Sequence, residues 1–330
     1  RLSQRSAAYR DVDDPSRSAY CAEVRAARVS DQAYDVAYKT DAATENSIPF
    51  LVPDNDAWQR LASQLGTALL PSVLTPARTG GPRGFDIGIE TTITTIDNDF
   101  DESVDDKELN ANYWRVGSEG PSTNSLDCGG STNRTVAGTL TLTRLRFRKG
   151  LPLGLEVGAS FGSLFHTRLW VPGVEVKLAL LEGLRRWFVP ELALRGAFNT
   201  AVGDSSYTLS AASFDVVASL PIVLGRVVTW TPHFAYQMGW IFAQTELVDL
   251  TPNVDAVQEG FASDEGHSQP FDPYTIGRTR MVGGMTIEYR NFSLAVEAAV
   301  DSAAPAVEGS TVLDNMPRQW TFAIAPTLSF

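Results

Sequence analysis

Residues 320–330, WTFAIAPTLSF, close the sequence and decide the fold. The odd-numbered positions of this stretch carry only threonine, alanine and serine, and the even-numbered positions carry Trp320, Phe322, Ile324, Pro326, Leu328 and Phe330. Successive side chains of a β-strand point to opposite faces, so this alternation predicts a strand with one apolar face that continues to Phe330.

Segments with the same period of two recur from residue 84 onward. Together with the closing stretch they predict about ten strands, with twelve as an alternative, in 85–96, 140–147, 153–165, 174–180, 188–198, 212–222, 228–240, 281–289, 292–300 and 320–330. In the second of these, Leu140 and Leu142 share one parity and Leu145 and Phe147 the other. We expect a β-bulge near Thr143 to restore the register.

The connections between these segments alternate between short and long. Tight links are expected near residues 150, 184, 225 and 290, and longer ones in 97–134, 166–172, 200–206, 246–278 and 302–318. All the tight links therefore fall at one end of the sheet, and all the longer ones fall at the other. A soluble β-sandwich has no reason to show this asymmetry.

The two faces of the strands differ in chemistry. In 228–240 one face carries Trp230, Phe234, Tyr236 and Trp240. The opposite faces of the strands collect ionisable residues, namely Asp86, Glu90, Arg144, Arg146, Glu156, Glu175, Lys177, Glu191, Arg195, Asp215, His233, Arg280, Glu288 and Glu297. Unpaired charges are costly in a dry core, so this face indicates a hydrated or salt-bridged interior.

With these features, residues 84–330 resemble a bacterial outer-membrane β-barrel, an all-β, closed, antiparallel, up-and-down transmembrane fold. Phe330 matches the terminal aromatic residue that the barrel-assembly machinery recognises in that class. The resemblance implies location in a Gram-negative outer membrane, a cleaved export signal, and outer-membrane lipid, lipopolysaccharide and other envelope proteins as partners. It selects no functional family and no transported solute.

Composition excludes other classes of protein. The net charge is −12, and binding to nucleic acid requires a basic surface, so nucleic acid is not an expected partner. The sequence contains no run of about 18 apolar residues, which a membrane-spanning helix needs. A soluble, β-rich secreted protein is a third alternative to the membrane barrel.

Residues 1–83 differ from the rest of the chain. Short helices are expected in 16–27 and 54–70, and in the second helix Trp58, Leu61 and Leu65 recur at helical spacing. This segment is either a periplasmic extension or a plug in the lumen, with a loose likeness to the fatty-acid channel family. Because about eight strands already fill with side chains, an extended chain should fit inside a ten-stranded barrel better than a helix.

The sequence contains two cysteines, which suffice for one disulfide in an oxidising envelope. Cys128 lies in the first long loop, whereas the residues just before the first strand lie at the end with the tight turns. A bridge between Cys21 and Cys128 would therefore require the N-terminal segment to thread the lumen or to pass around the barrel.

The first long loop contains an incomplete calcium-binding pattern. Oxygen ligands at alternate positions can converge on Ca²⁺, and they are Asp97, Asp99, Asp101, Ser103, Asp105 and Glu108. Glu102 occupies the position where the pattern has glycine, and a strand rather than a helix precedes the loop. A solvated acidic loop, with no cofactor, is the favoured interpretation.

The long loop in 246–272 is also acidic and contains neither lysine nor arginine. His267 lies near Asp264 and Asp272, which suggests half of a hydrolytic site, but no activated nucleophile accompanies them. Salt bridges are the favoured interpretation of the basic residues Arg144, Arg146 and Arg148, with anion attraction as the alternative. We therefore expect a non-enzymatic barrel, either a narrow or plugged porin-like channel or a scaffold with acidic outer loops. An outer-membrane protease or lipid-modifying hydrolase is the alternative.

Overall fold

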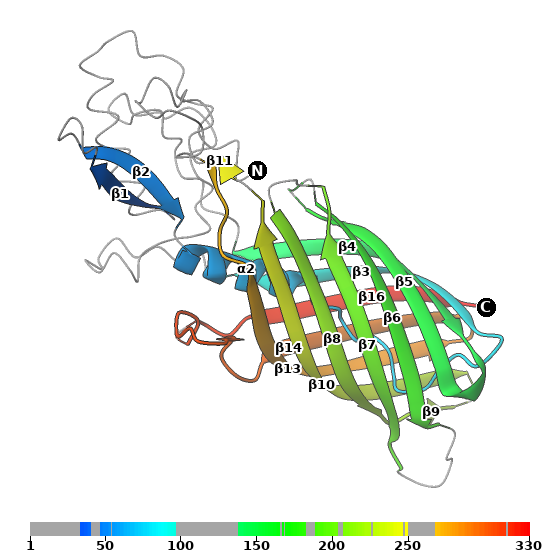
Figure 1. The fold of residues 1–330 in the computed structure, drawn as a ribbon. Helices are drawn as coiled ribbons and strands as arrows, with labels where there is room; N and C mark the ends of the chain where they lie inside the picture. The colour runs from blue at the N-terminus through cyan, green and yellow to red at the C-terminus, as the bar shows by residue number, and fades with distance from the viewer. Residues whose placement is uncertain are drawn as a thin grey trace.

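The computed structural model describes residues 34–40, 47–53, 55–96, 138–165, 167, 169–182, 189–203, 207–225, 227–246, 248–249, 268–314 and 316–330. For residues 34–40, 47–53, 56–57, 248–249 and 268–269, only the backbone is described. Most of these residues form a tilted barrel of strands, and one helix enters the barrel at one end (Figure 1).

The barrel wall is one antiparallel sheet. Its long strands are β3 (Phe85–Thr95), β4 (Thr139–Gly150), β5 (Leu155–Leu164), β6 (Trp170–Leu181), β7 (Glu191–Ala201), β8 (Tyr207–Ser219), β10 (Val228–Thr245), β13 (Tyr274–Tyr289), β14 (Phe292–Asp301) and β16 (Trp320–Ser329). The sheet has twelve strands, and two of them, β9 (Ile222–Leu224) and β15 (Ala306–Val307), are short, so ten strands form the wall.

The ring is closed by pairing between strands that are distant in sequence. β16 pairs with β3, and β10 pairs with β13, so every long strand has two neighbours. At the seam, Phe330 donates its backbone N–H to the carbonyl of Phe85 over 2.8 Å and accepts from it over 3.1 Å. The expected closed, antiparallel, ten-stranded barrel is confirmed.

Large apolar side chains cover the outside of the barrel, because the wall strands alternate. Exposed examples from the middle of the wall are Val174, Val176, Val216, Phe234, Met281, Met285 and Ile324. The alternate positions are buried and include Glu156, Asp215 and Arg280. The division of faces that the sequence indicates is therefore present in the fold.

The bulge expected near Thr143 is absent. The pairing of β4 with β3 and with β5 is continuous through this residue, and the described register shift lies in the β6–β7 pair, between Ala179 and Leu181. Leu142 points into the barrel, whereas Leu145 points outward. The apolar residues therefore change from even to odd positions because the inner face is apolar in the first half of the strand and charged in the second. The backbone register does not change.

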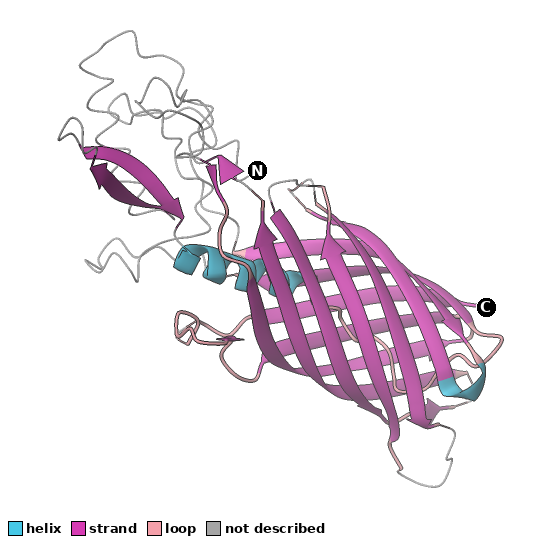
Figure 2. Cartoon of the chain, viewed as in Figure 1, coloured by secondary structure: helices cyan, strands magenta, loops and turns pink. Residues whose placement is uncertain are grey.

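The N-terminal part contains a hairpin of β1 (Tyr34–Thr40) and β2 (Ser47–Pro53), followed by helix α2 (Asn55–Leu69). A second small hairpin pairs β11 (Val248–Asp249) with β12 (Ser268–Gln269). Figure 2 shows α2 at one end of the barrel and the 3₁₀ helix η2 (Pro152–Gly154), which forms the β4–β5 turn, at the other. Among the described residues, no helix has the length and apolarity needed to cross a membrane.

Candidate functional site

Helix α2 occupies the lumen at the end with the long loops. Trp58 packs against Tyr207 at the start of β8 and Phe271 before β13, with ring centroids 6.1 Å and 5.6 Å apart. Deeper in the lumen, apolar residues of the helix contact inward-facing residues of the wall, namely Leu142, Leu164, Leu209, Ile241 and Ile276. The helix thus forms the core of this end of the barrel.

Small residues make room for the helix. A Cβ atom on Gly66 would lie 2.3 Å from Cγ2 of Ile241, and one on Gly239 would lie 2.7 Å from Cδ2 of Leu70. The wall adds Ala201, Ala211 and Ala243 around the same core. The expectation that an extended chain would fit inside better than a helix was therefore wrong at this end, because small residues widen the lumen.

Helix α2 ends where the chain meets Pro71. The N–H of Leu70 donates to the carbonyls of Gly66 and Thr67, and Pro71 has no N–H with which to continue the helix. Residues 70–84 then run along the lumen without regular structure, and we call them the strap. Residues 62–77 are all buried, so the end of the helix and most of the strap are enclosed by the wall.

Side chains of the wall form hydrogen bonds with the backbone of the helix end and of the upper strap, residues 70–74. Asn199 donates to the carbonyl of Leu69 over 2.6 Å, and Gln237 donates to the carbonyl of Pro71 over 2.8 Å. The carboxylate of Glu297 accepts from the N–H groups of Val73 and Leu74 over 3.2 Å and 2.5 Å. Buried backbone groups must be paired, and these side chains take the place of a neighbouring strand.

The lower strap, residues 75–84, is held in the same way. The ammonium group of Lys177 donates to the carbonyls of Pro76 and Arg78 over 3.2 Å and 3.0 Å, and the N–H of Ala77 donates to the hydroxyl of Ser219 over 2.9 Å. The N–H of Gly150, where β4 ends, donates to the carbonyl of Gly84 over 3.1 Å. The strap therefore spans the lumen from the helix to the end with the tight turns.

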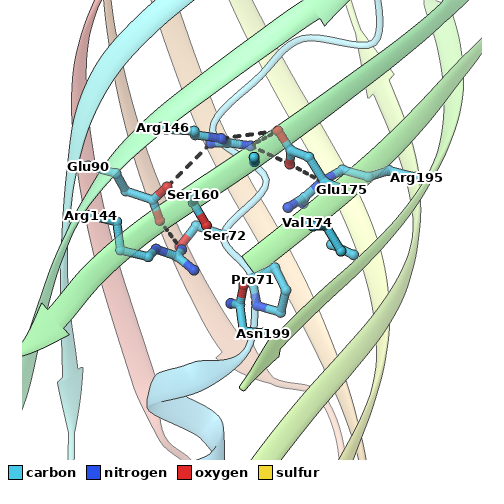
Figure 3. A pocket seen from close by; sticks show the side chains of 12 residues that line it. Pro71, Ser72, Glu90, Arg144, Arg146, Ser160, Val174, Glu175, Arg195 and Asn199 are labelled. Atoms are coloured by element: carbon cyan, nitrogen blue, oxygen red, sulfur yellow. Dashed lines mark hydrogen bonds and ion pairs between the residues drawn. The ribbon is translucent and has the colours of Figure 1, made fainter. Parts of the chain in front are cut away.

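The charged residues of the wall form a chain of ion pairs beside the strap. Arg146 lies 3.4 Å from Glu90 and 2.7 Å from Glu175, and Glu175 lies 3.0 Å from Arg195. Arg195 in turn lies 3.0 Å from Asp215. Figure 3 shows these side chains, apart from Asp215, converging from neighbouring strands on the space next to Pro71.

Each arginine of the basic series on β4 has a carboxylate partner. Arg144 pairs with Glu90, and Arg148 lies 3.3 Å from Asp86 and 3.7 Å from Glu156. Glu156 also lies 2.9 Å from Lys177. This arrangement favours the salt-bridge interpretation of the series over the anion-attraction interpretation.

The opposite wall carries a second group of buried polar side chains. Arg278 lies 2.5 Å from Asp301 and donates to the hydroxyl of Ser63 in α2 over 2.7 Å. Arg280 donates to the amide oxygen of Gln237, which holds the strap. His233 lies 3.7 Å from Glu297 and is buried in the lumen. Two other predicted interior residues, Glu191 and Glu288, lie near the tight-turn end and are half-buried.

The space beside the strap is small. A cavity beside the strap, lined by Ser72, Glu90, Arg146, Glu175 and Arg195, has a water-accessible volume of about 10 Å³. About 10–15 Å³ is needed to hold a single water molecule. The cavity therefore has room for about one water molecule and none for a hydrated ion or a small solute.

Several sequence-based predictions fall outside the described residues. These are the calcium pattern of residues 97–108, the cysteines at 21 and 128, the expected helix in 16–27, and His166, Asp264 and His267. Asp272 is described, and its carboxylate accepts from the side-chain amide of Asn55 over 2.7 Å. Within the described ranges, no group of three or more His, Cys, Asp and Glu residues is placed to hold a metal ion.

Sequence reasoning missed the neutral residues that hold the chain, namely Asn199, Gln237 and Ser219. A single polar residue on an inward face gives no signal of its own. The inward apolar residues at the long-loop end did give one, because stretches such as 240–243, WIFA, are apolar on both faces. A strand that is apolar on both faces must contact something apolar on each side.

No family model matches the chain, and no curated protein matches it. Among solved structures, Ail, the attachment invasion locus protein of Yersinia pestis, in complex with the heparin analogue sucrose octasulfate, is 9% identical, with a TM-score of 0.25, over 75% of this chain and 98% of that chain. A second Ail structure is 10% identical, with a TM-score of 0.24 and the same coverage. The KdgM porin in complex with disordered oligogalacturonate is 8% identical, with a TM-score of 0.26, over 75% of this chain and 99% of that chain. At these identities and TM-scores the similarity identifies no specific family.

Proposed function

We propose that this protein is a non-enzymatic outer-membrane barrel that its own N-terminal chain closes, and that it serves as a membrane-anchored scaffold rather than as an open pore. Its partners in this role are outer-membrane lipid and lipopolysaccharide, together with the barrel-assembly machinery that inserts it. The short turns face the periplasm, and the long loops face the outside, as is usual for such barrels.

The outer surface supports a membrane location. Apolar side chains surround the middle of the wall, and exposed aromatic residues lie towards both ends. Those at the long-loop end are Trp170, Trp240 and Trp320, and those at the tight-turn end are Tyr289, Phe292 and Phe330. Two aromatic girdles that flank an apolar band match the two interfaces of a bilayer.

The observation that carries the proposed closed state is the burial of the chain inside the barrel. Residues 62–77 are all buried, and the cavity beside them has a volume of about 10 Å³. Arg144, Arg146 and Arg195, which line this cavity, are each paired with a carboxylate, so they present no unpaired positive charge to a passing ion. A porin-like channel would require a continuous aqueous path in place of these contacts.

Planar-bilayer recording of the full-length protein tests this function. The unmodified protein should insert without producing a steady current. A variant with Asn199→Ala, Gln237→Ala and Glu297→Ala removes three side chains that hold the helix end and the upper strap, and it should show intermittent current. A matched variant with Glu308→Ala, Asp314→Ala and Arg318→Ala changes exposed residues between β14 and β16, and it should stay silent. A steady ohmic current from the unmodified protein would exclude the closed scaffold.

The described histidine gives no support to a hydrolase. His233 is buried at the centre of the lumen next to the strap, where a substrate has no access. Its neighbour Glu297 already accepts two N–H groups of the strap. These contacts support a structural role for both residues.

A further inference from the structure

Helix α2 and the strap pass through the barrel in one direction, from the end with the long loops to the end with the tight turns. Helix α2 begins at the long-loop end, where Asn55 exchanges two hydrogen bonds with Asp272, through its side-chain amide N–H and its amide oxygen. One turn later, Gln59 accepts a hydrogen bond over 2.9 Å from Ser310, between β15 and β16. The start of the helix is thus tied to two different long loops.

The contacts of the chain with the wall then descend steadily towards the other end. Asn199, in the half of β7 nearer the long loops, bonds Leu69, and Ser219, at the lower end of β8, bonds Ala77. The chain finally leaves the lumen beside the β4–β5 turn, where Gly84 bonds Gly150. Figure 1 shows the start of α2 and the C-terminus at opposite ends of the barrel.

The chain has no room to turn back. A second pass would need a channel about 10 Å wide for a helix, or about 5 Å wide for an extended chain. Around the helix, inward-facing wall residues pack against its apolar side chains, and the cavity beside the strap has a volume of about 10 Å³. The residues that precede Asn55 must therefore leave the barrel through the end with the long loops.

We propose that residues 1–54 are displayed on the outer side of the membrane, carried there by a chain that threads the barrel to which it is attached. This inference rests on the outer-membrane orientation proposed above. It adds a function for the lumen, which holds a tether rather than conducting a solute. The β1–β2 hairpin belongs to the displayed part.

Epitope tags at three positions of the full-length chain test this topology. One tag precedes Tyr34, one follows Gly309 in a long connection, and one follows Gly225 in a tight turn. Folding of each variant is checked by heat-modifiable migration on a gel. Antibody should label the first two tags on intact cells, and the Gly225 tag only after permeabilisation. Labelling of the Tyr34 tag only after permeabilisation would overturn the proposal.

Proteolysis of the untagged protein gives a second measurement that needs no insertion. Proteinase K added to intact cells should remove the segment before Asn55 and leave a membrane-bound fragment that begins near that residue and keeps the strap. Mass spectrometry identifies the first residue of this fragment. An N-terminal segment that stays uncut on intact cells but is cut after permeabilisation contradicts surface display. Because neither readout depends on current, failure of this inference is distinguishable from failure of the closed scaffold.

Discussion

Glu297 joins the barrel wall to the chain inside it. Its two carboxylate oxygens accept the N–H groups of Val73 and Leu74, and Leu74 has a positive φ of 47°. A left-handed conformation is unfavourable for a residue with a side chain, and these hydrogen bonds help to hold it. This carboxylate thus helps to fix the path of the strap at the middle of the barrel.

The substitution Glu297→Gln should loosen the strap. An amide keeps one acceptor oxygen, but its NH₂ group would face an N–H of the strap, so one buried N–H loses its acceptor. We expect the free energy of unfolding to fall by about 1–3 kcal/mol. Urea unfolding in detergent micelles measures the change.

Glu308→Gln is the matched control, because Glu308 is exposed in a long connection. Its unfolding midpoint should equal that of the unmodified protein. Equal midpoints for both variants would show that the carboxylate at 297 does not hold the strap.

At this scale, the sequence predicted which ionisable side chains face inward but not what they bond. The alternation around Glu297 fixes the direction of its side chain, because the period of a strand is two. Its partners, Val73 and Leu74, lie more than 200 positions away in sequence. No local pattern encodes a hydrogen bond to the backbone of a distant, irregular segment.

At the scale of single elements, helix α2 lies in the lumen of a ten-stranded barrel, which would ordinarily be too narrow for a helix. The spacing of Trp58, Leu61 and Leu65 predicts the helix, and its observed bounds differ from the predicted ones by one residue at each end. The partner surface was not predicted, because the apolar inner faces of strands such as β4 were attributed to a bulge. Leu140 and Leu142 in fact contact the helix core.

The substitution Gly66→Ala separates helix propensity from packing. Propensity alone predicts a gain of about 1 kcal/mol, because alanine is the better helix former. The added Cβ would lie 2.3 Å from Cγ2 of Ile241, so we expect a net loss of about 1–2 kcal/mol instead. Thermal unfolding followed by circular dichroism gives the sign.

Gly283→Ala is the control for this substitution, because an added Cβ there meets no atom within 4 Å. It should leave the thermal midpoint close to that of the unmodified protein. A higher midpoint for Gly66→Ala would show that the helix does not press against Ile241.

The outer face of β6 tests contact with lipid. Val176 is 51% exposed near the middle of this strand. An arginine there would place a charge in hydrocarbon, at a cost of about 2–4 kcal/mol near the midplane of the bilayer. Folding into phosphatidylcholine vesicles, titrated with urea, measures this cost. Leu224→Arg, at the tight-turn end, should cost far less, and equal costs for both variants would argue against a membrane-spanning wall.

At the scale of the whole molecule, the sequence predicted the closed barrel because every strand repeats the same two-faced pattern. It left open whether the N-terminal segment lies in the periplasm or in the lumen. That choice depends on whether the interior volume matches a helix and a strap, which is a property of ten strands together. Residues 62–77 are buried inside the barrel, held by side chains from both halves of the wall.

The described residues that flank the two cysteine-bearing segments lie at one end of the barrel. Residue 55 lies at the long-loop end, as do residues 96 and 138, which flank the first long loop. We therefore expect a Cys21–Cys128 disulfide. The chain-entropy model assigns about 4–5 kcal/mol to a loop of this length. Mass spectrometry of non-reduced peptides should find the two cysteines in one linked species, and two free thiols would rule the bridge out.

A tether that runs the full height of the barrel also changes how the protein bears force. Tension applied to the chain before Asn55 would first reach the side chains that hold the strap and then the start of β3 at the far rim. Phe85 is held there on one side by Phe330 and on the other by Lys149. A pull from the long-loop end would therefore draw the far rim inward, against the whole wall, before any strand could separate from its neighbours.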